Sequence, residues 1–471
     1  MNTLQATPLL RTPDGMLALD EPVDLLGYQR DCSSLPAGKA VQVARPRDAR
    51  DVAAVLVEAS ARGTPVYVRG GGTMYAGGAN PAAGGVVLDM TGLDRILDLD
   101  PEAGVVVVEP GVKFGALSAA LAPHGLTIGI IPSTAPAATI GGAASAHALG
   151  TGSARFQSFA DEVVGLEVVL PDGRVLHTGS AAAPAGRWFH RYGMGPDLSG
   201  LFLGGDATLG VITKIALWLH PLPAFRATAC YGFPDAPAAT RFILALQQRE
   251  WLQNVWYGSG YEGGTVRARV TAARPDIPPE SLPGFCIGLD YGGEQDAVAR
   301  DQARVLALAA DCGGGDFELF NELYFQRLRG EQIYWYTFAG YFARSRCGLL
   351  MASLPTNGLP AFAAALDGIR AQHPGYAWGG AVVLCRRGLH GGVLGFYDEA
   401  TQWQAVQPVM RDCAQRLVVA GCTPYKTGKM WAPQVQAMTA YHGVLRQLKQ
   451  SFDPAGVLSP GNLGLQASGS G

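Results

Sequence analysis

Two glycine-rich loops are the segments of the chain best suited to bind an anion. Residues 70–73 follow a short strand predicted at 65–69, and a second glycine pair lies near the centre of the small-residue stretch 131–152. Glycine lets the backbone approach a ligand closely, and successive backbone N–H groups bind anions such as a pyrophosphate. Neither loop matches G-x-G-x-x-G at a helix start or G-x-x-x-x-G-K-[ST]. The residues alone therefore leave two alternatives, a phosphate-binding site or simple tight turns.

Short strands and helices must position these loops. Hydrophobic periodicity and turn residues predict an α+β first half, followed from about residue 224 by a second region with dense aromatic and arginine residues. Such a change in residue composition indicates a second domain that supplies a pocket. The predicted helices are 47–63, a helix beginning near 114, 236–250, 295–311, 360–372 and 400–420, and the predicted strands are 65–69, 86–89, 105–109, 163–170, 174–176 and 211–215.

Composition excludes several classes of protein. The 471 residues are 48% hydrophobic, which excludes a disordered chain, and the net charge of −3 gives no reason to expect nucleic acid or an anionic membrane as a partner. No C-x-x-C or H-x-H pair predicts a metal site. No apolar run is long enough for a membrane span and no signal peptide is apparent, so a cytoplasmic protein is expected.

The order of several motifs is more specific than composition. The chain contains, in this order, P-V-Y-V-R-G-G-G-T-M-Y-A-G-G-A, V-V-E-P-G-V, P-S-T-A-P-A-A-T-I-G-G-A, E-V-V-L-P-D-G, L-F-L-G-G-D-A-T-L-G-V-I-T-K-I and, near its end, F-D-P-A-G-V-L-S-P-G-N. This order resembles the FAD-binding domain and C-terminal segment of the vanillyl-alcohol oxidase superfamily. The resemblance covers nearly all of residues 36–223 and 421–465.

The resemblance implies a fold and a cofactor. The fold is α+β, with a two-subdomain PCMH-type (p-cresol methylhydroxylase-type) FAD-binding domain and an α+β cap domain built on an antiparallel sheet. The implied boundaries are 1–223 for the FAD-binding domain, 224–420 for the cap or substrate domain, and 421–471 for a segment that returns to the FAD domain. The implied FAD contacts are Gly70, Gly71, Gly72, Thr73, Met74, Ser133, Thr134, Thr139, Gly142, Ala143, Ile212 and Asn462.

Covalent attachment of FAD is left open by the resemblance. Many members of the superfamily link FAD through a histidine after the first glycines, and Thr73 occupies that position here. The vanillyl-alcohol oxidase branch instead uses a cap-domain histidine, and His390 lies in a stretch similar to its attachment strand. The alternative is that His390 is an ordinary histidine in a glycine-rich strand.

The implied catalytic residues are Tyr425, Lys426 and Ser133. The first two resemble a Tyr-Arg pair that holds a phenolate in the vanillyl-alcohol oxidase branch, and a hydroxyl beside a cation can stabilise an oxyanion. Ser133 stands where the phenol-oxidising members have an aspartate, and a serine cannot act as a carboxylate base. The base must then come from elsewhere, for example from Tyr425 or a histidine.

The resemblance implies an FAD-dependent oxidase or dehydrogenase. Its expected substrate is a small, aromatic alcohol or phenol that passes hydride to the flavin, with dioxygen or another electron acceptor as second partner. The aromatic-rich cap favours a flat substrate. One alternative is a 2-hydroxy-acid dehydrogenase acting on D-lactate or glycolate, and another is a flavoprotein with a non-redox or binding role. Members often form homodimers, but no residue fixes the oligomeric state.

Overall fold

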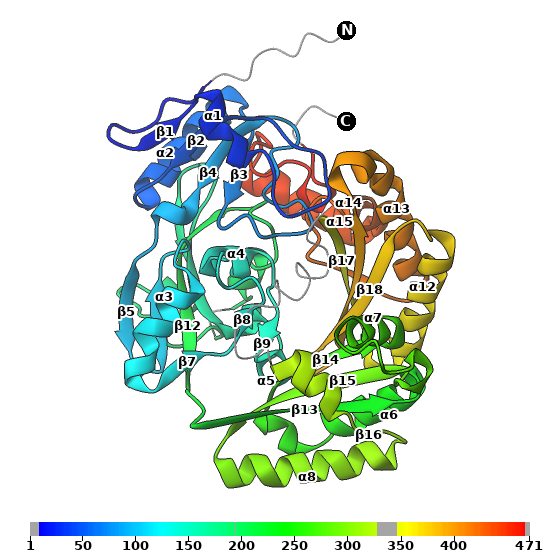
Figure 1. Ribbon diagram of the computed structural model, residues 1–471. Coiled ribbons are helices and arrows are strands. Elements are labelled where there is room, and N and C mark those ends of the chain that lie inside the picture. The colour runs from blue at the N-terminus through cyan, green and yellow to red at the C-terminus, as the bar shows by residue number, and fades with distance from the viewer. Residues whose placement is uncertain (1–8, 194, 327–345, 467–471) are drawn as a thin grey trace.

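The described part of the chain contains three large β-sheets with flanking helices (Figure 1) and one two-stranded sheet, formed by β8 (Ile131–Pro132) and β9 (Gly150–Thr151). The computed structural model describes residues 9–193, 195–326 and 346–466. The aromatic run of the predicted cap, residues 334–342, lies entirely outside these ranges.

The first sheet has four strands in the order β1-β2-β4-β3. Strands β2 and β3 run parallel to β4, and helix α2 packs on them through an apolar face. Asp48 begins α2 because its side chain accepts the N–H groups of Arg50 and Asp51, and Gly63 ends the helix at φ 64°. The elements are β1 (Leu17–Leu19), α1 (Pro22–Leu25), β2 (Ala40–Arg45), α2 (Ala49–Arg62), β3 (Val66–Arg69) and β4 (Gly85–Asp89).

The second sheet is antiparallel, in the order β11-β10-β12-β6-β5, with β7 also paired to β12. Every residue of β10 is buried, which explains its nearly unbroken apolar sequence. The elements are β5 (Ile96–Asp100), β6 (Val105–Val108), α3 (Phe114–Leu121), β7 (Leu126–Ile128), β8 (Ile131–Pro132), α4 (Ile140–Ser145), β9 (Gly150–Thr151), α5 (Ser153–Phe156), β10 (Val163–Val169), β11 (Val175–His177) and β12 (Val211–Pro221).

The third sheet has eight antiparallel strands in the order β16-β13-β15-β14-β18-β19-β17-β20. Helices α6, α8, α12 and α13 share one apolar core with the sheet. The elements are β13 (Phe225–Phe233), α6 (Ala236–Gln247), β14 (Val255–Glu262), α7 (Gly263–Ala273), β15 (Phe285–Gly293), α8 (Gln295–Asp311), β16 (Gly315–Asp316), α9 (Glu318–Phe320), β17 (Arg346–Leu354), α12 (Leu359–Gln372), β18 (Ala377–Leu384), β19 (Leu389–Tyr397), α13 (Glu399–Val419) and β20 (Thr423–Tyr425).

The side chains of strand β17 show which face of the third sheet packs into the apolar core and which face is turned toward the site. Leu350, Ala352 and Leu354 are buried in the core beneath the helices, whereas Leu349 and Met351 alternate with them and are only partly buried. Successive side chains of a strand point to opposite faces. The face without these helices is therefore the one turned toward the glycine-rich loops.

The chain finally returns to the first sheet through α14 (Ala432–Ala437) and α15 (Thr439–Phe452), drawn in red in Figure 1. The Val66 N–H donates to the Val457 carbonyl at 2.8 Å, and the Ser459 N–H donates to the Val66 carbonyl at 2.7 Å. The predicted α+β fold with an antiparallel cap sheet is confirmed. No helix in the described ranges is both long enough and apolar enough to cross a bilayer.

Candidate FAD and substrate site

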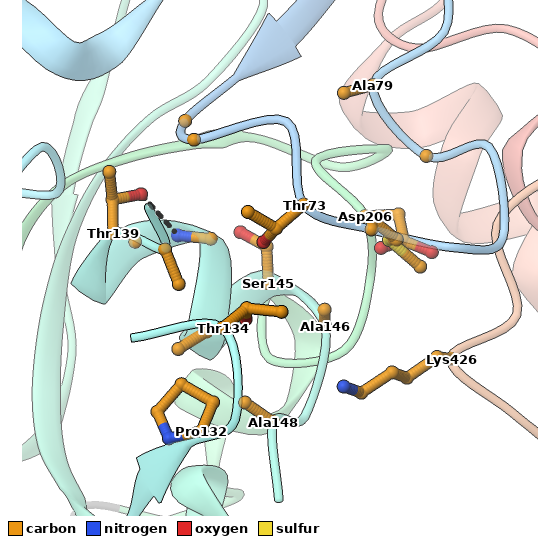
Figure 2. Close-up of a pocket in the computed structure, with 18 of the residues that line it drawn as sticks. Thr73, Ala79, Pro132, Thr134, Thr139, Ser145, Ala146, Ala148, Asp206 and Lys426 are labelled. Carbon is orange, nitrogen blue, oxygen red and sulfur yellow. Dashed lines mark hydrogen bonds between the residues drawn. The ribbon is translucent and has the colours of Figure 1, made fainter. Parts of the chain in front are cut away.

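A cavity with about 1350 Å³ of empty space lies between the glycine-rich loops and the third sheet (Figure 2). Its wall is built by the loop after β3, the loop and helix of α4, the loop before β12, and residues of β17, β18 and β20. Segments far apart in sequence therefore share one cavity. The sequence-predicted residues that line it are Gly70, Gly71, Gly72, Thr73, Met74, Ser133, Thr134, Thr139, Gly142, Ala143, Ile212, Tyr425 and Lys426.

The first glycine loop offers unpaired backbone donors to this cavity. Within the described ranges, none of the N–H groups of residues 71–74 donates a hydrogen bond to the protein. Gly72 adopts φ 65°, and a Cβ on Gly71 would stand 1.9 Å from the Ala137 carbonyl oxygen. Consecutive free N–H groups in a turn form an anion-binding nest. The loop thus fits the pyrophosphate of FAD, and the flavin would supply hydride-accepting chemistry in the same cavity.

The second loop is held in place by Thr139. Its hydroxyl accepts the Gly142 N–H at 3.2 Å and thereby begins α4, as Figure 2 shows. A Cβ on Gly70 would stand 2.3 Å from that same hydroxyl, so the two glycine loops are packed against each other. Glycine is required here because the close approach leaves no room for a side chain.

Tyr425 and Lys426 line the cavity at the end of β20, the last strand of the third sheet. Tyr425 ends β20, and its buried hydroxyl donates to the carbonyl of His147. Lys426 follows in the left-handed conformation, at φ 53°, and its amine points into the cavity in Figure 2. Burial lowers the pKa of Lys426 to about 8. The amine is therefore largely protonated at neutral pH and can face a negative charge.

Ser133 lies on the cavity wall. Its side chain is a hydroxyl, so it cannot act there as a carboxylate base. Among the described residues of the wall, the one carboxyl side chain is that of Asp206. Asp206 comes from the loop before β12 and was missed as a site residue. Its signal in the sequence is a lone acidic residue within a glycine-rich motif, Gly204-Gly205-Asp206.

Two predicted FAD contacts lie outside the cavity wall. Asn462 is fully buried beneath the first loop, where its amide donates to the carbonyls of Gly78 at 2.9 Å and Asp206 at 3.0 Å. His390 packs its ring against that of Tyr425, with 4.4 Å between the centroids. Burial lowers the pKa of His390 to about 4, and the positive Lys426 adds to the effect.

The apolar part of the wall was also missed. Leu349 and Met351 of β17 and Val383 of β18 face the cavity, as do Leu149 and Tyr75. The sequence signal for the strand residues is the alternation within 346–354, which becomes interpretable only when the sheet's two faces are known. No group of three His, Cys, Asp or Glu residues that could hold a metal occurs in the described ranges.

Comparison with known proteins agrees with this geometry. Residues 40–179 match the family described as FAD binding domain. An FAD-linked oxidoreductase of Mycobacterium tuberculosis is 25% identical over 90% of this chain and 91% of its own. The glycolate oxidase subunit GlcD of Bacillus subtilis is 24% identical over 94% of this chain and 93% of its own.

The fold has solved counterparts. The structure of p-cresol methylhydroxylase with substrate bound superimposes with a TM-score of 0.80 and 16% identity, over 95% of this chain and 94% of the other. The FAD-binding match covers the first glycine loop and the second, and the shared fold extends through the third sheet. The protein is therefore an FAD-linked oxidoreductase with an FAD-binding domain at residues 40–179 and the fold of p-cresol methylhydroxylase.

Proposed function

We propose that the protein oxidises a small aromatic alcohol or phenol, whose oxygen is held against Lys426. The observation that carries the proposal is a single amine facing a cavity whose third-sheet wall is apolar. Lys426 is the one lysine or arginine among the described residues of that wall. A substrate with one oxygen and a flat apolar body matches this distribution of charge.

The apolar side of the cavity supports the same substrate shape. Leu349 and Met351 project from β17, Val383 projects from β18 on the other side of β19, and Tyr425 lies on β20 opposite Met351. Methionine and leucine side chains pack well on an aromatic ring, and methionine adapts to its outline. These residues would orient the substrate and keep water from it.

Each oxidation removes one hydride and one proton from the substrate. FAD bound in the cavity would accept the hydride with its electron pair and would later give the electrons to dioxygen or another acceptor. The substrate proton passes to solvent water, and Lys426 stabilises the negative charge that develops on the substrate oxygen. A donor placed in this way contributes about 10²–10³-fold to the rate in other enzymes.

The test is anaerobic reduction of the bound flavin by a panel of candidate substrates. We expect loss of the yellow colour with para-alkylphenols or aromatic alcohols, and none with D-lactate or glycolate. Dithionite serves as the control that the flavin can be reduced. Reduction by the hydroxy acids alone would contradict the proposal.

A second candidate is oxidation of a 2-hydroxy acid. It is favoured by the similarity to a glycolate oxidase subunit over 94% of the chain. In that case Lys426 would bind the substrate carboxylate instead of an alkoxide or phenolate. The same panel separates the two candidates, because each predicts a different class of reductant.

A further inference from the structure

Asp206 places a carboxyl group beside the loop that fits the FAD pyrophosphate. Its side chain is 7% exposed and lines the cavity. A Cβ on Gly78, four residues beyond the free N–H groups of residues 71–74, would stand 3.4 Å from Asp206 Oδ1. An ionised carboxylate at this position would repel the phosphates of FAD, since burial weakens solvent screening.

The backbone holds Asp206 in this place against a local strain. Asp206 and Ala207 adopt φ 46° and 54°, in the left-handed region that costs about 1–2 kcal/mol for a residue with a Cβ. The Asp206 N–H donates to the Ser145 carbonyl at 3.1 Å, and Asn462 donates to the Asp206 carbonyl at 3.0 Å. Backbone strain of this kind is retained where a functional site requires the strained conformation.

No cation neutralises the carboxyl directly. Asp206 Oδ2 accepts the Gly428 N–H at 2.9 Å, and no ion pair joins Asp206 to another described residue. The nearest cations are Lys426 and Lys429, and Asp31 opposes them with a like charge. Lys429 Nζ is already committed to the Asn462 side chain at 2.6 Å and to the Gly77 carbonyl at 2.9 Å.

We propose that Asp206 faces bound FAD as a neutral carboxylic acid, and that the cavity takes up one proton from solvent when FAD binds. The protonated oxygen then presents a donor toward the cofactor, where the ionised group would present only repulsion. Burial already raises the pKa of Asp206 to about 7 in the protein alone. The two negative charges of a bound pyrophosphate raise that pKa further, so the complex retains the proton at pH 8.

The first test is infrared spectroscopy of the FAD-bound protein at pH 8. The difference spectrum between wild type and Asp206→Asn is expected to contain the C=O stretch of a protonated carboxyl, shifted in D₂O. Asp51→Asn is the matched control, because Asp51 is equally buried but is paired with Arg47, which lowers its pKa. Its difference spectrum should lack that band. Absence of the band from the Asp206→Asn difference spectrum would overturn the proposal, whether or not FAD is covalently attached.

The second test is the pH dependence of FAD affinity, measured by flavin fluorescence. Uptake of one proton predicts a dissociation constant that rises about tenfold per pH unit above pH 7. Asp206→Asn should flatten this rise between pH 7 and 8, and Lys426→Met should retain it. A flat wild-type profile contradicts the proposal. If Asp206→Asn fails to fold, the slopes of wild type and Lys426→Met still decide the question.

Discussion

The hydroxyl of Ser353 lies 2.9 Å from Nδ1 of His390, across the paired strands β17 and β19. This contact, together with the Tyr425 ring beside it, fixes the orientation of the imidazole. His390 is thus part of a packed cluster at the edge of the site, and it is not among the residues that line the cavity. The position of His390 therefore decides whether FAD can be attached covalently to its imidazole.

We expect FAD to be bound without a covalent bond to His390. Acid precipitation of the purified protein should release the yellow flavin into the supernatant. His390→Ala should then retain most of its FAD, because the glycine loops and not the histidine hold the cofactor. Flavin that stays with the wild-type pellet, and is released from His390→Ala, would show instead that His390 is the attachment residue.

Gly71→Ala should abolish FAD binding. The new Cβ would lie 1.9 Å from the Ala137 carbonyl oxygen, so the first loop must move away from the second. Gly115→Ala in α3 is the matched control, because nothing lies within 4 Å of its added Cβ. The absorbance ratio of flavin to protein measures the outcome, and equal FAD content in both variants would contradict the role of the first loop.

Asn462→Ala should destabilise the protein by about 1–3 kcal/mol, since it leaves buried polar groups without a partner. Asn462 is 0% exposed and links Lys429 to the carbonyls of Gly78 and Asp206. Denaturant unfolding of the variant measures the loss. The exposed Gln450→Ala serves as control, and an Asn462→Ala variant as stable as that control would contradict the supporting role.

Much of the fold was predictable because local patterns and tertiary packing agree. Helices α8 and α12 and strands β3 and β10 lie within about a residue of their predicted ranges, where apolar periodicity and flanking glycine or proline both mark the ends. That the glycine loops bind an anion stays a prediction, because the glycines alone fit tight turns as well. The domain boundaries at 223 and 420 stay a prediction.

The rest of the site depends on long-range packing. Leu349 and Val383 lie in segments for which no strand was predicted, and only the register of the third sheet turns them toward the cavity. Asp206 lies in a motif that was noted for its glycines. Only the folded structure shows that no described lysine or arginine forms an ion pair with its carboxyl group. The attachment of FAD to His390 stays a prediction, because a local resemblance does not give the distance between a side chain and a cofactor.

Flavin reduction by a non-ionising aromatic alcohol should slow as the pH rises through the pKa of Lys426. Burial lowers the pKa of Lys426 to about 8, and the amine stabilises an oxyanion only while it carries its proton. Lys426→Arg should remove this decline, since arginine stays charged throughout the range. Stopped-flow absorbance gives both profiles, and a decline shared by the two proteins would assign the titration to another group.

Lys426 is the group that meets the substrate oxygen in the proposed reaction. The most direct measurement is the anaerobic rate of flavin reduction in Lys426→Met, compared with wild type at equal FAD content. We predict a loss of about 10²–10³-fold in the reduction rate, as for removal of an oxyanion donor elsewhere. A Lys426→Met variant that is reduced as fast as wild type would contradict the proposed function.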